Sequence, residues 1–87
     1  MSQLIIPTVH LNGTSRQALV DGYNEACTAL QGALGALQDA EPNARDYYPQ
    51  GDGVFAAARA QHAERIAVVR KVFDELQTIY DALVQAK

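Results

Sequence analysis

The side chains best suited to bind a ligand are concentrated in the segment 43–51, which reads Asn-Ala-Arg-Asp-Tyr-Tyr-Pro-Gln-Gly. Tyrosine offers a flat face for stacking and a polar tip, and arginine offers a forked donor for phosphates and carboxylates. Pro49 stiffens the segment and lowers the entropy lost on binding. The composition is typical of a site for an anion that carries a ring. Two alternatives stay open: the tyrosines cap a helical core, and Asp46 simply holds Arg45.

A second polar segment, His10 to Ser15, combines an imidazole, an amide, an Asn-Gly turn pair and a threonine. We interpret it as a further part of a binding site, and the alternative is a plain turn that caps a helix.

His62 and Arg65 also suggest a ligand site, because these two polar residues interrupt an apolar repeat. An arginine at a core position is costly unless it is paired or faces a wet cleft. The alternative is that Arg65 snorkels to the surface and His62 makes one hydrogen bond.

These segments predict a ligand site with no metal and no catalytic residue. The predicted binding residues are His10, Asn12, Arg45, Tyr47, Tyr48, His62 and Arg65, with Arg59, Gln50 and Thr14 as further candidates.

Two long helices are expected to position these side chains, in a single all-α domain over 1–87. The predicted fold is an antiparallel two-helix hairpin with an extended N-terminal arm. We expect an arm over 1–13, a helix over 14–40, a connector over 41–53 and a helix over 54–86. Thr14 and Gln17 have the spacing of a capping box, and Asp52 is a plausible N-cap for the second helix.

Apolar residues follow a 3-4 spacing in both predicted helices, which is typical of helices that pack lengthwise. The first seam is Leu19, Tyr23, Ala26, Leu30, Ala33 and Leu37, widened by Cys27 and Leu34. The second seam is Phe55, Ala58, His62, Arg65, Val69, Val72, Leu76, Ile79 and Leu83, flanked by Ile66, Phe73 and Tyr80. Both helices have apolar positions beyond these seams, and Gly32 and Gly35 with nearby alanines form a smooth surface. We therefore expect a homo-oligomer.

The two polar connecting segments lie at opposite ends of such a hairpin. They can meet in one site only if the arm folds back or if protomers pack head to tail. An antiparallel dimer would place the His10 end of one chain beside the Tyr47 end of another.

Composition excludes several classes of protein. The chain has 87 residues, of which 7 are basic and 10 acidic, and this net charge of −3 disfavours binding to duplex nucleic acid. No apolar run reaches the roughly 18 residues of a membrane span. The start of the chain lacks the features of a signal peptide, so we expect a cytoplasmic protein. The single Cys27 permits no internal disulfide and is expected to pack in the core.

No enzyme, P-loop, dinucleotide or zinc motif is present in the sequence, so we expect a binding protein without a cofactor. The segments 6–15 and 42–51, together with His62-Ala63-Glu64-Arg65, resemble those of a family of small phage and prophage proteins. That resemblance covers nearly the whole chain, and a phage-encoded protein of this kind is expected in the cytoplasm of the host cell. The resemblance implies that His10, Asn12, Arg45, Tyr47, Tyr48, His62 and Arg65 are the site residues.

The chain is also similar in size, helical content and predicted assembly to oligomeric phage sponges that sequester nucleotide immune signals, the Lockin type among them. This resemblance implies an anti-defence function, namely the binding of a cyclic ADP-ribose-type signal or a cyclic oligonucleotide without turnover. One alternative is a protein–protein inhibitor of a host defence complex, similar to an anti-CRISPR protein, in which exposed acids such as Asp74, Glu75 and Asp81 would matter most. A structural helical-hairpin oligomer and a small nucleotide-cleaving enzyme are the remaining alternatives.

Overall fold

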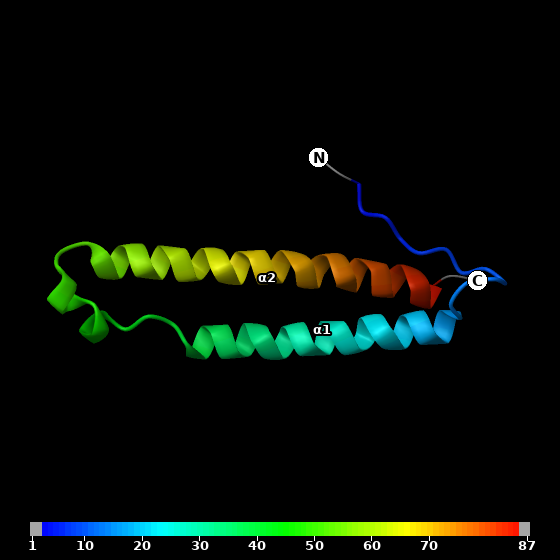
Figure 1. Cartoon of the computed structure of the whole chain (residues 1–87), viewed down its shortest axis with the longest axis horizontal. Helices are drawn as coiled ribbons and strands as arrows, with labels where there is room; N and C mark the ends of the chain where they lie inside the picture. The colour runs from blue at the N-terminus through cyan, green and yellow to red at the C-terminus, as the bar shows by residue number, and fades with distance from the viewer. Residues whose placement is uncertain (1–2, 86–87) are drawn as a thin grey trace.

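Two long helices joined by a short connector make up most of the protein. The computed structural model describes residues 3–85 and places α1 at Arg16–Asp39 and α2 at Val54–Gln85. The two helices lie side by side as a helical hairpin, and the connector closes one end of it (Figure 1). Residues 3–85 contain no β-strand. The all-helical fold class is confirmed, and the helix bounds differ from the predicted ones by at most two residues, apart from position 86, which lies outside the described residues.

The N-cap of the first helix lies one residue later than the predicted one. Ser15 is the N-cap of α1, and its hydroxyl accepts a hydrogen bond from the backbone N–H of Ala18 at 3.1 Å. The predicted capping box of Thr14 and Gln17 is therefore wrong. Gln17 is already inside the helix, where its amide donates to the Asp21 carboxylate one turn on. Two adjacent hydroxyl residues both suit a cap, and the backbone angles at Ser15 decide between them.

The connector between the helices consists of two short 3₁₀ turns, η1 at Ala44–Asp46 and η2 at Tyr48–Gln50. Glycines then turn the chain into α2, because Gly51 has φ +111° and Gly53 has φ +82°. These angles are strained for any residue with a Cβ atom. The carbonyl of Gly53 accepts the first hydrogen bond of α2, from the N–H of Ala57 at 3.1 Å. Gly53 therefore holds the cap position that was predicted for Asp52.

The core is a single thin layer between the helices. Its most buried apolar side chains are Cys27 and Leu34 from α1 and Ile79 and Leu83 from α2, with Leu83 only 1% exposed. Ala33 is exposed, so its predicted place in the seam is wrong. The inward-facing positions of α1 keep the 3-4 spacing but in a shifted frame: Val20, Tyr23, Cys27, Leu30, Leu34 and Leu37.

The seam of α2 differs from the predicted one at two points. Arg65 is exposed, and the neighbouring Ile66 is more buried. Val72 is also exposed, and Phe73 lies closer to the core. Successive residues of a helix are about 100° apart, so only one of two neighbours can point at the partner helix. The predicted core fault at Arg65 is therefore absent, whereas His62 is buried as expected.

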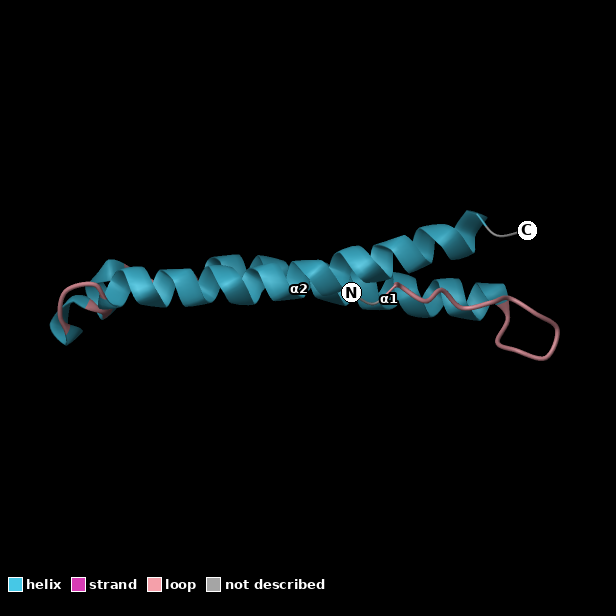
Figure 2. Ribbon diagram, turned by 90° about the horizontal axis from the view of Figure 1, so that it is seen from above, coloured by secondary structure: helices cyan, strands magenta, loops and turns pink. Residues whose placement is uncertain are grey.

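The N-terminal arm is extended over the part of it that the structure describes, and residues 1 and 2 lie outside that part. It folds back from the end of the hairpin opposite the connector and lies on the α2 side of the hairpin in Figure 1, whereas from above it lies beside the C-terminal half of α2 (Figure 2). Leu4 shares a shallow hollow there with Ala67 and Lys71. Leu11, by contrast, is 97% exposed.

Neither α1 nor α2 is apolar enough over its length to span a bilayer, as judged on residues 3–85.

Candidate functional site

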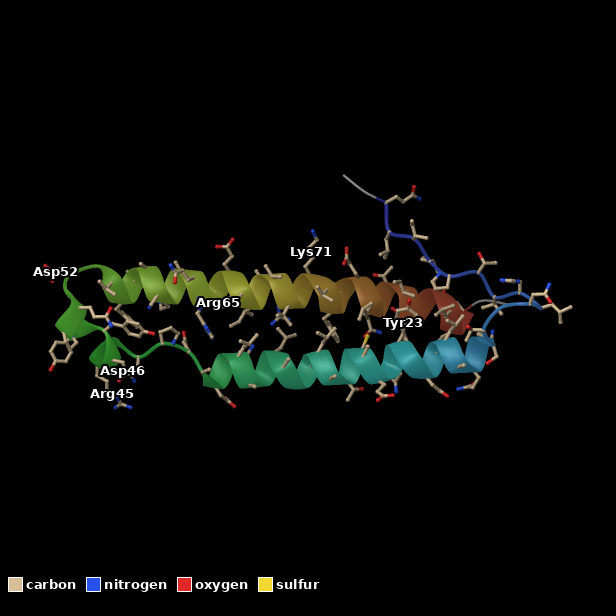
Figure 3. The ribbon with its side chains drawn as sticks, viewed as in Figure 1. Tyr23, Arg45, Asp46, Asp52, Arg65 and Lys71 are labelled. Carbon is tan, nitrogen blue, oxygen red and sulfur yellow. The ribbon has the colours of Figure 1, made fainter. Side chains whose placement is uncertain are left out.

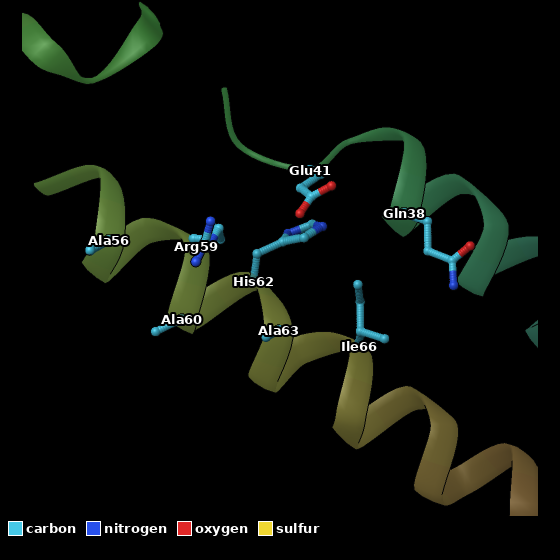
Figure 4. A pocket seen from close by; sticks show the side chains of 8 residues that line it. All are labelled: Gln38, Glu41, Ala56, Arg59, Ala60, His62, Ala63 and Ile66. Atoms are coloured by element: carbon cyan, nitrogen blue, oxygen red, sulfur yellow. The ribbon is translucent and has the colours of Figure 1, made fainter. Parts of the chain in front are cut away.

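A groove lies at the connector end of the hairpin, where α1 stops and α2 begins. Its volume is about 420 Å³, within the size range of small-molecule sites. The end of α1 and the residues just after it contribute Gln38 and Glu41, and α2 contributes the rest (Figure 4). The full lining is Gln38, Glu41, Ala56, Arg59, Ala60, His62, Ala63 and Ile66. Three alanines leave room on the α2 side, and the polar groups surround that space.

Arg59 is held at the groove by aromatic neighbours. Its guanidinium carbon lies 5.7 Å from the centre of the Phe55 ring, one turn earlier on α2. That ring in turn meets the Tyr47 ring, with centres 6.3 Å apart and planes tilted by 42°. Both geometries are favourable for aromatic and cation–π contacts. The stack links the connector to α2 and restrains the Arg59 guanidinium, which makes no ion pair with any described residue.

His62 joins the two helices beneath the groove. The side chain is 7% exposed, and its Nε2 lies 2.5 Å from the backbone carbonyl oxygen of Leu37. A carbonyl can only accept a hydrogen bond, so Nε2 carries the proton and donates. The last turn of α1 has no basic residue of its own, and its carbonyls carry partial negative charge. His62 therefore caps α1 from the neighbouring helix, as the hydrogen-bonded alternative for this residue predicted.

The other predicted residues of the connector lie near the groove but point to solvent. Arg45, Tyr48 and Gln50 are exposed, Tyr48 at 77%. Arg45 and Asp46 both lie at the connector end (Figure 3), and the structure shows no ion pair between them. The backbone N–H of Arg45 instead donates to the Asn43 side chain. The alternative in which Asp46 holds Arg45 is therefore wrong.

His10, Asn12 and Thr14 lie at the opposite end of the hairpin, whose longest extent is 61 Å. All three are exposed. The predicted turn is present, because the N–H of Gly13 donates to the carbonyl of His10 at 3.1 Å. The His10 ring covers Gly13 so closely that a Cβ atom there would lie 2.7 Å from its Nε2. Within one chain these residues cannot share a site with Arg59 or Tyr47.

Arg65 belongs to a different surface from the groove. It lines a shallow hollow on α2 with Gln61, Glu64, Val68 and Val69, and it makes no ion pair or hydrogen bond with any described residue. Of the predicted site residues, the groove therefore brings together only His62 and Arg59, with Tyr47 behind them. The groove residues that sequence reasoning missed are Gln38 and Glu41. Their position at the predicted end of the first helix, beside the start of the second, is the signal that was available.

Cys27 lies about three turns of α1 away from the groove and takes no part in it. Burial raises the pKa of the thiol above its ordinary value, and the negative charge of Asp81 adds to the shift. The thiol is therefore neutral and inert, in agreement with the prediction that it packs in the core. Within residues 3–85 no three His, Cys, Asp or Glu side chains come together in a way that could hold a metal ion.

Comparison of the chain with protein-family models, with curated proteins and with solved structures finds no match.

Proposed function

We propose that this protein binds a small nucleotide-derived anion in the groove at the connector end and sequesters it without turnover. In a phage or prophage setting, the ligand would be a host immune signal of the cyclic ADP-ribose or cyclic oligonucleotide class. The observation that carries the proposal is the groove of about 420 Å³ with the restrained guanidinium of Arg59 on its rim. A nucleotide presents the two kinds of group that this lining suits.

The first kind is a phosphate, which can take charge-assisted hydrogen bonds from Arg59. The second is a base edge with amino or imino donors. The Glu41 carboxylate and the Gln38 amide oxygen can accept hydrogen bonds from such donors. The exposed ring of Tyr48, on the connector, offers a further stacking face. Glu41 repels an anion that lies beside it, and a nucleotide can present a neutral base edge to this carboxylate while its phosphate lies at Arg59.

Binding without chemistry is supported by the residue types in the groove. The lining contains no hydroxyl, thiol or amine nucleophile, and its one carboxylate, Glu41, is exposed to water. Its one imidazole uses Nε2 to hold Leu37. A residue committed to a structural hydrogen bond is poorly placed to relay protons.

The direct test is calorimetry of the wild type against cyclic ADP-ribose, cyclic dinucleotides and a DNA duplex. We expect binding of at least one nucleotide and none of the duplex. Arg59→Ala should weaken nucleotide binding about tenfold to a hundredfold, because a hydrogen bond to a charged group is worth about 1.5–3 kcal/mol. Arg70→Ala is the matched control, since this exposed arginine of α2 lies outside the groove.

Two results would contradict the proposal. One is the absence of binding to every nucleotide tested, and the other is equal loss in the Arg59→Ala and Arg70→Ala variants. Heating the complex and analysing the supernatant by mass spectrometry separates sequestration from turnover. An unchanged ligand supports sequestration, and a cleaved ligand would make the protein an enzyme.

A second candidate function is inhibition of a host protein complex. It is favoured by the exposed Asp74, Glu75 and Asp81 on α2 and by the exposed Ile5 and Leu11 on the arm. An exposed apolar arm beside acidic side chains suits a partner with a basic, partly apolar surface. Replacement of Asp74 and Glu75 by Asn and Gln would abolish such inhibition and leave nucleotide binding intact.

The assembly that we propose is a homo-oligomer of antiparallel hairpins. His10, Asn12 and Thr14 can then contribute only to the groove of a neighbouring protomer. Nucleotide binding that weakens in His10→Ala would support such a shared site, and unchanged binding would assign His10 to its own turn.

A further inference from the structure

We propose that a second copy of this chain packs on one face of the hairpin, formed by Val68 and Val72 of α2 and by Gly22, Ala29 and Ala33 of α1. The inference rests on the large accessible surface that a single chain leaves exposed and on the exposure of these residues. It does not depend on the proposed ligand, and the readout of its test is molecular mass.

Helix geometry places these five residues together. Each is rotated by roughly 80° to 130° from the inward-facing positions of its helix, at 100° per residue. Gln38 and Arg59 are rotated in the opposite sense, and both line the groove on one face of the hairpin. The five residues therefore share the other face.

This face carries large exposed apolar side chains, with the polar Gln61, Glu64 and Arg65 beside Val68 at its edge. Val68 is 59% exposed and Val72 40%, although both are large aliphatic side chains in the middle of a helix. On α1 a hollow of about 290 Å³ is lined by Ala18, Leu19, Gly22, Tyr23 and Ala26. A Cβ atom added at Gly22 would meet nothing within 4 Å, so the space above it is unfilled by the chain itself. The arm does not cover this face, because it runs along the outer side of α2.

The single chain buries too little surface for its size. It exposes 6604 Å², whereas a compact monomer of 9.4 kDa exposes about 5,000 Å². The radius of gyration is 18.5 Å, whereas about 12 Å is usual for this length. The excess surface, about 1,600 Å², is larger than the roughly 800 Å² that each partner buries in a standard interface.

A second copy supplies the missing layer with matching dimensions. The 24 residues of α1 span about 36 Å, and two adjacent helices are about 20 Å wide, so the face covers about 700 Å². Another hairpin presents a face of the same length, width and composition, and its valines fit above the small residues of α1. The result is a four-helix bundle in which the groove of each chain faces outward.

The test is the mass of the full chain in solution, measured by light scattering and sedimentation at micromolar concentration. We expect the wild type at twice 9.4 kDa or a higher multiple, and Val68→Asp at 9.4 kDa or with at least a tenfold higher dissociation constant. Val84→Asp is the matched control, because Val84 is 48% exposed but is rotated toward the groove side. On α1, Ala29→Glu should dissociate the assembly and Gln31→Glu should not.

Helicity by circular dichroism accompanies each mass, so that dissociation is separated from unfolding. Should Val68→Asp unfold, the wild-type mass together with Ala29→Glu decides. A monomeric wild type, a stable assembly in Val68→Asp and Ala29→Glu, or equal dissociation by Val84→Asp would overturn the proposal. If the wild type is monomeric and a foreign protein binds to this face, the second copy is the wrong occupant. Calorimetry measures nucleotide binding separately, so failure of this proposal is distinguishable from failure of the groove proposal.

Discussion

His62 is the residue that links the end of α1 to the start of α2. Its donor reaches the carbonyl of Leu37, and its ring forms the floor of the groove. The same side chain thus stabilises the hairpin and shapes the site. Arg59 differs, because it is exposed, is restrained only by Phe55 and has donors available for a ligand. The two residues lie within one turn of α2, and burial separates their roles.

We expect His62→Ala to lower the free energy of unfolding by about 2 kcal/mol, through the lost hydrogen bond and the lost packing of the ring. His62→Gln should recover part of this loss, because the amide of glutamine can donate to the same carbonyl. Thermal unfolding at one fixed protein concentration is the measurement. Gln61→Ala, at the exposed neighbouring position, is the control, and an equal loss in that variant would refute the capping role.

Cys27 makes the stability of the fold depend on pH in the alkaline range. The folded state raises the pKa of the thiol, so the unfolded state releases this proton at a lower pH than the folded state. The contribution of the thiol to stability is complete below its ordinary pKa of 9.0 and is lost as pH rises through the higher value of the folded state. We expect the melting temperature of the wild type to fall more steeply above pH 9 than that of Cys27→Val. Parallel curves for the two proteins would contradict this expectation.

At the scale of the elements, glycines have opposite effects in the helix and in the connector. Gly35 lies inside α1, where its backbone is helical and a Cβ atom would meet nothing within 4 Å. Gly53 precedes α2 with φ +82°, an angle that a residue with a Cβ atom rarely adopts. One helix therefore contains a glycine that weakens it, and the connector contains one that it requires.

We expect Gly35→Ala to raise the free energy of unfolding by about 0.5–1 kcal/mol and Gly53→Ala to lower it by about 1–2 kcal/mol. Chemical denaturation of both variants at equal protein concentration measures the difference. Destabilisation by Gly35→Ala would mean that another backbone approaches α1 at this point, on a face that the proposed association leaves open.

At the scale of the whole molecule, the hairpin has two different long faces. One carries the groove, with Arg59, Glu41 and Gln38, and the other carries Val68, Val72 and the small residues of α1. The arm lies on neither, because it follows the outer side of α2 (Figure 1). This division permits association through one face while a ligand occupies the other. Nucleotide affinity, measured by calorimetry, should accordingly change less than threefold in Val68→Asp, which alters only the face without the groove.

Local sequence determined the elements of this protein. The 3-4 spacing of apolar residues, the Asn12-Gly13 turn and the glycines before α2 act within a few residues of one another, so they predict two helices and their connector closely. Ser15 and Thr14 show the limit of such reasoning, because both can cap and only one adopts the required backbone angles.

The tertiary structure decided which residues share a surface. A seam with spacing near 3.5 residues drifts around a helix of 3.6 residues per turn, so the inward residue changes between neighbours such as Arg65 and Ile66 along the packed length. The groove depends on packing even more, because Gln38 and Glu41 meet Arg59 only through the hairpin, across about twenty residues of chain. His10 and Asn12, although suited to binding by type, lie at the far end of a molecule 61 Å long. The residue type determines what a side chain can do, whereas distances in the folded chain determine which side chains can act together.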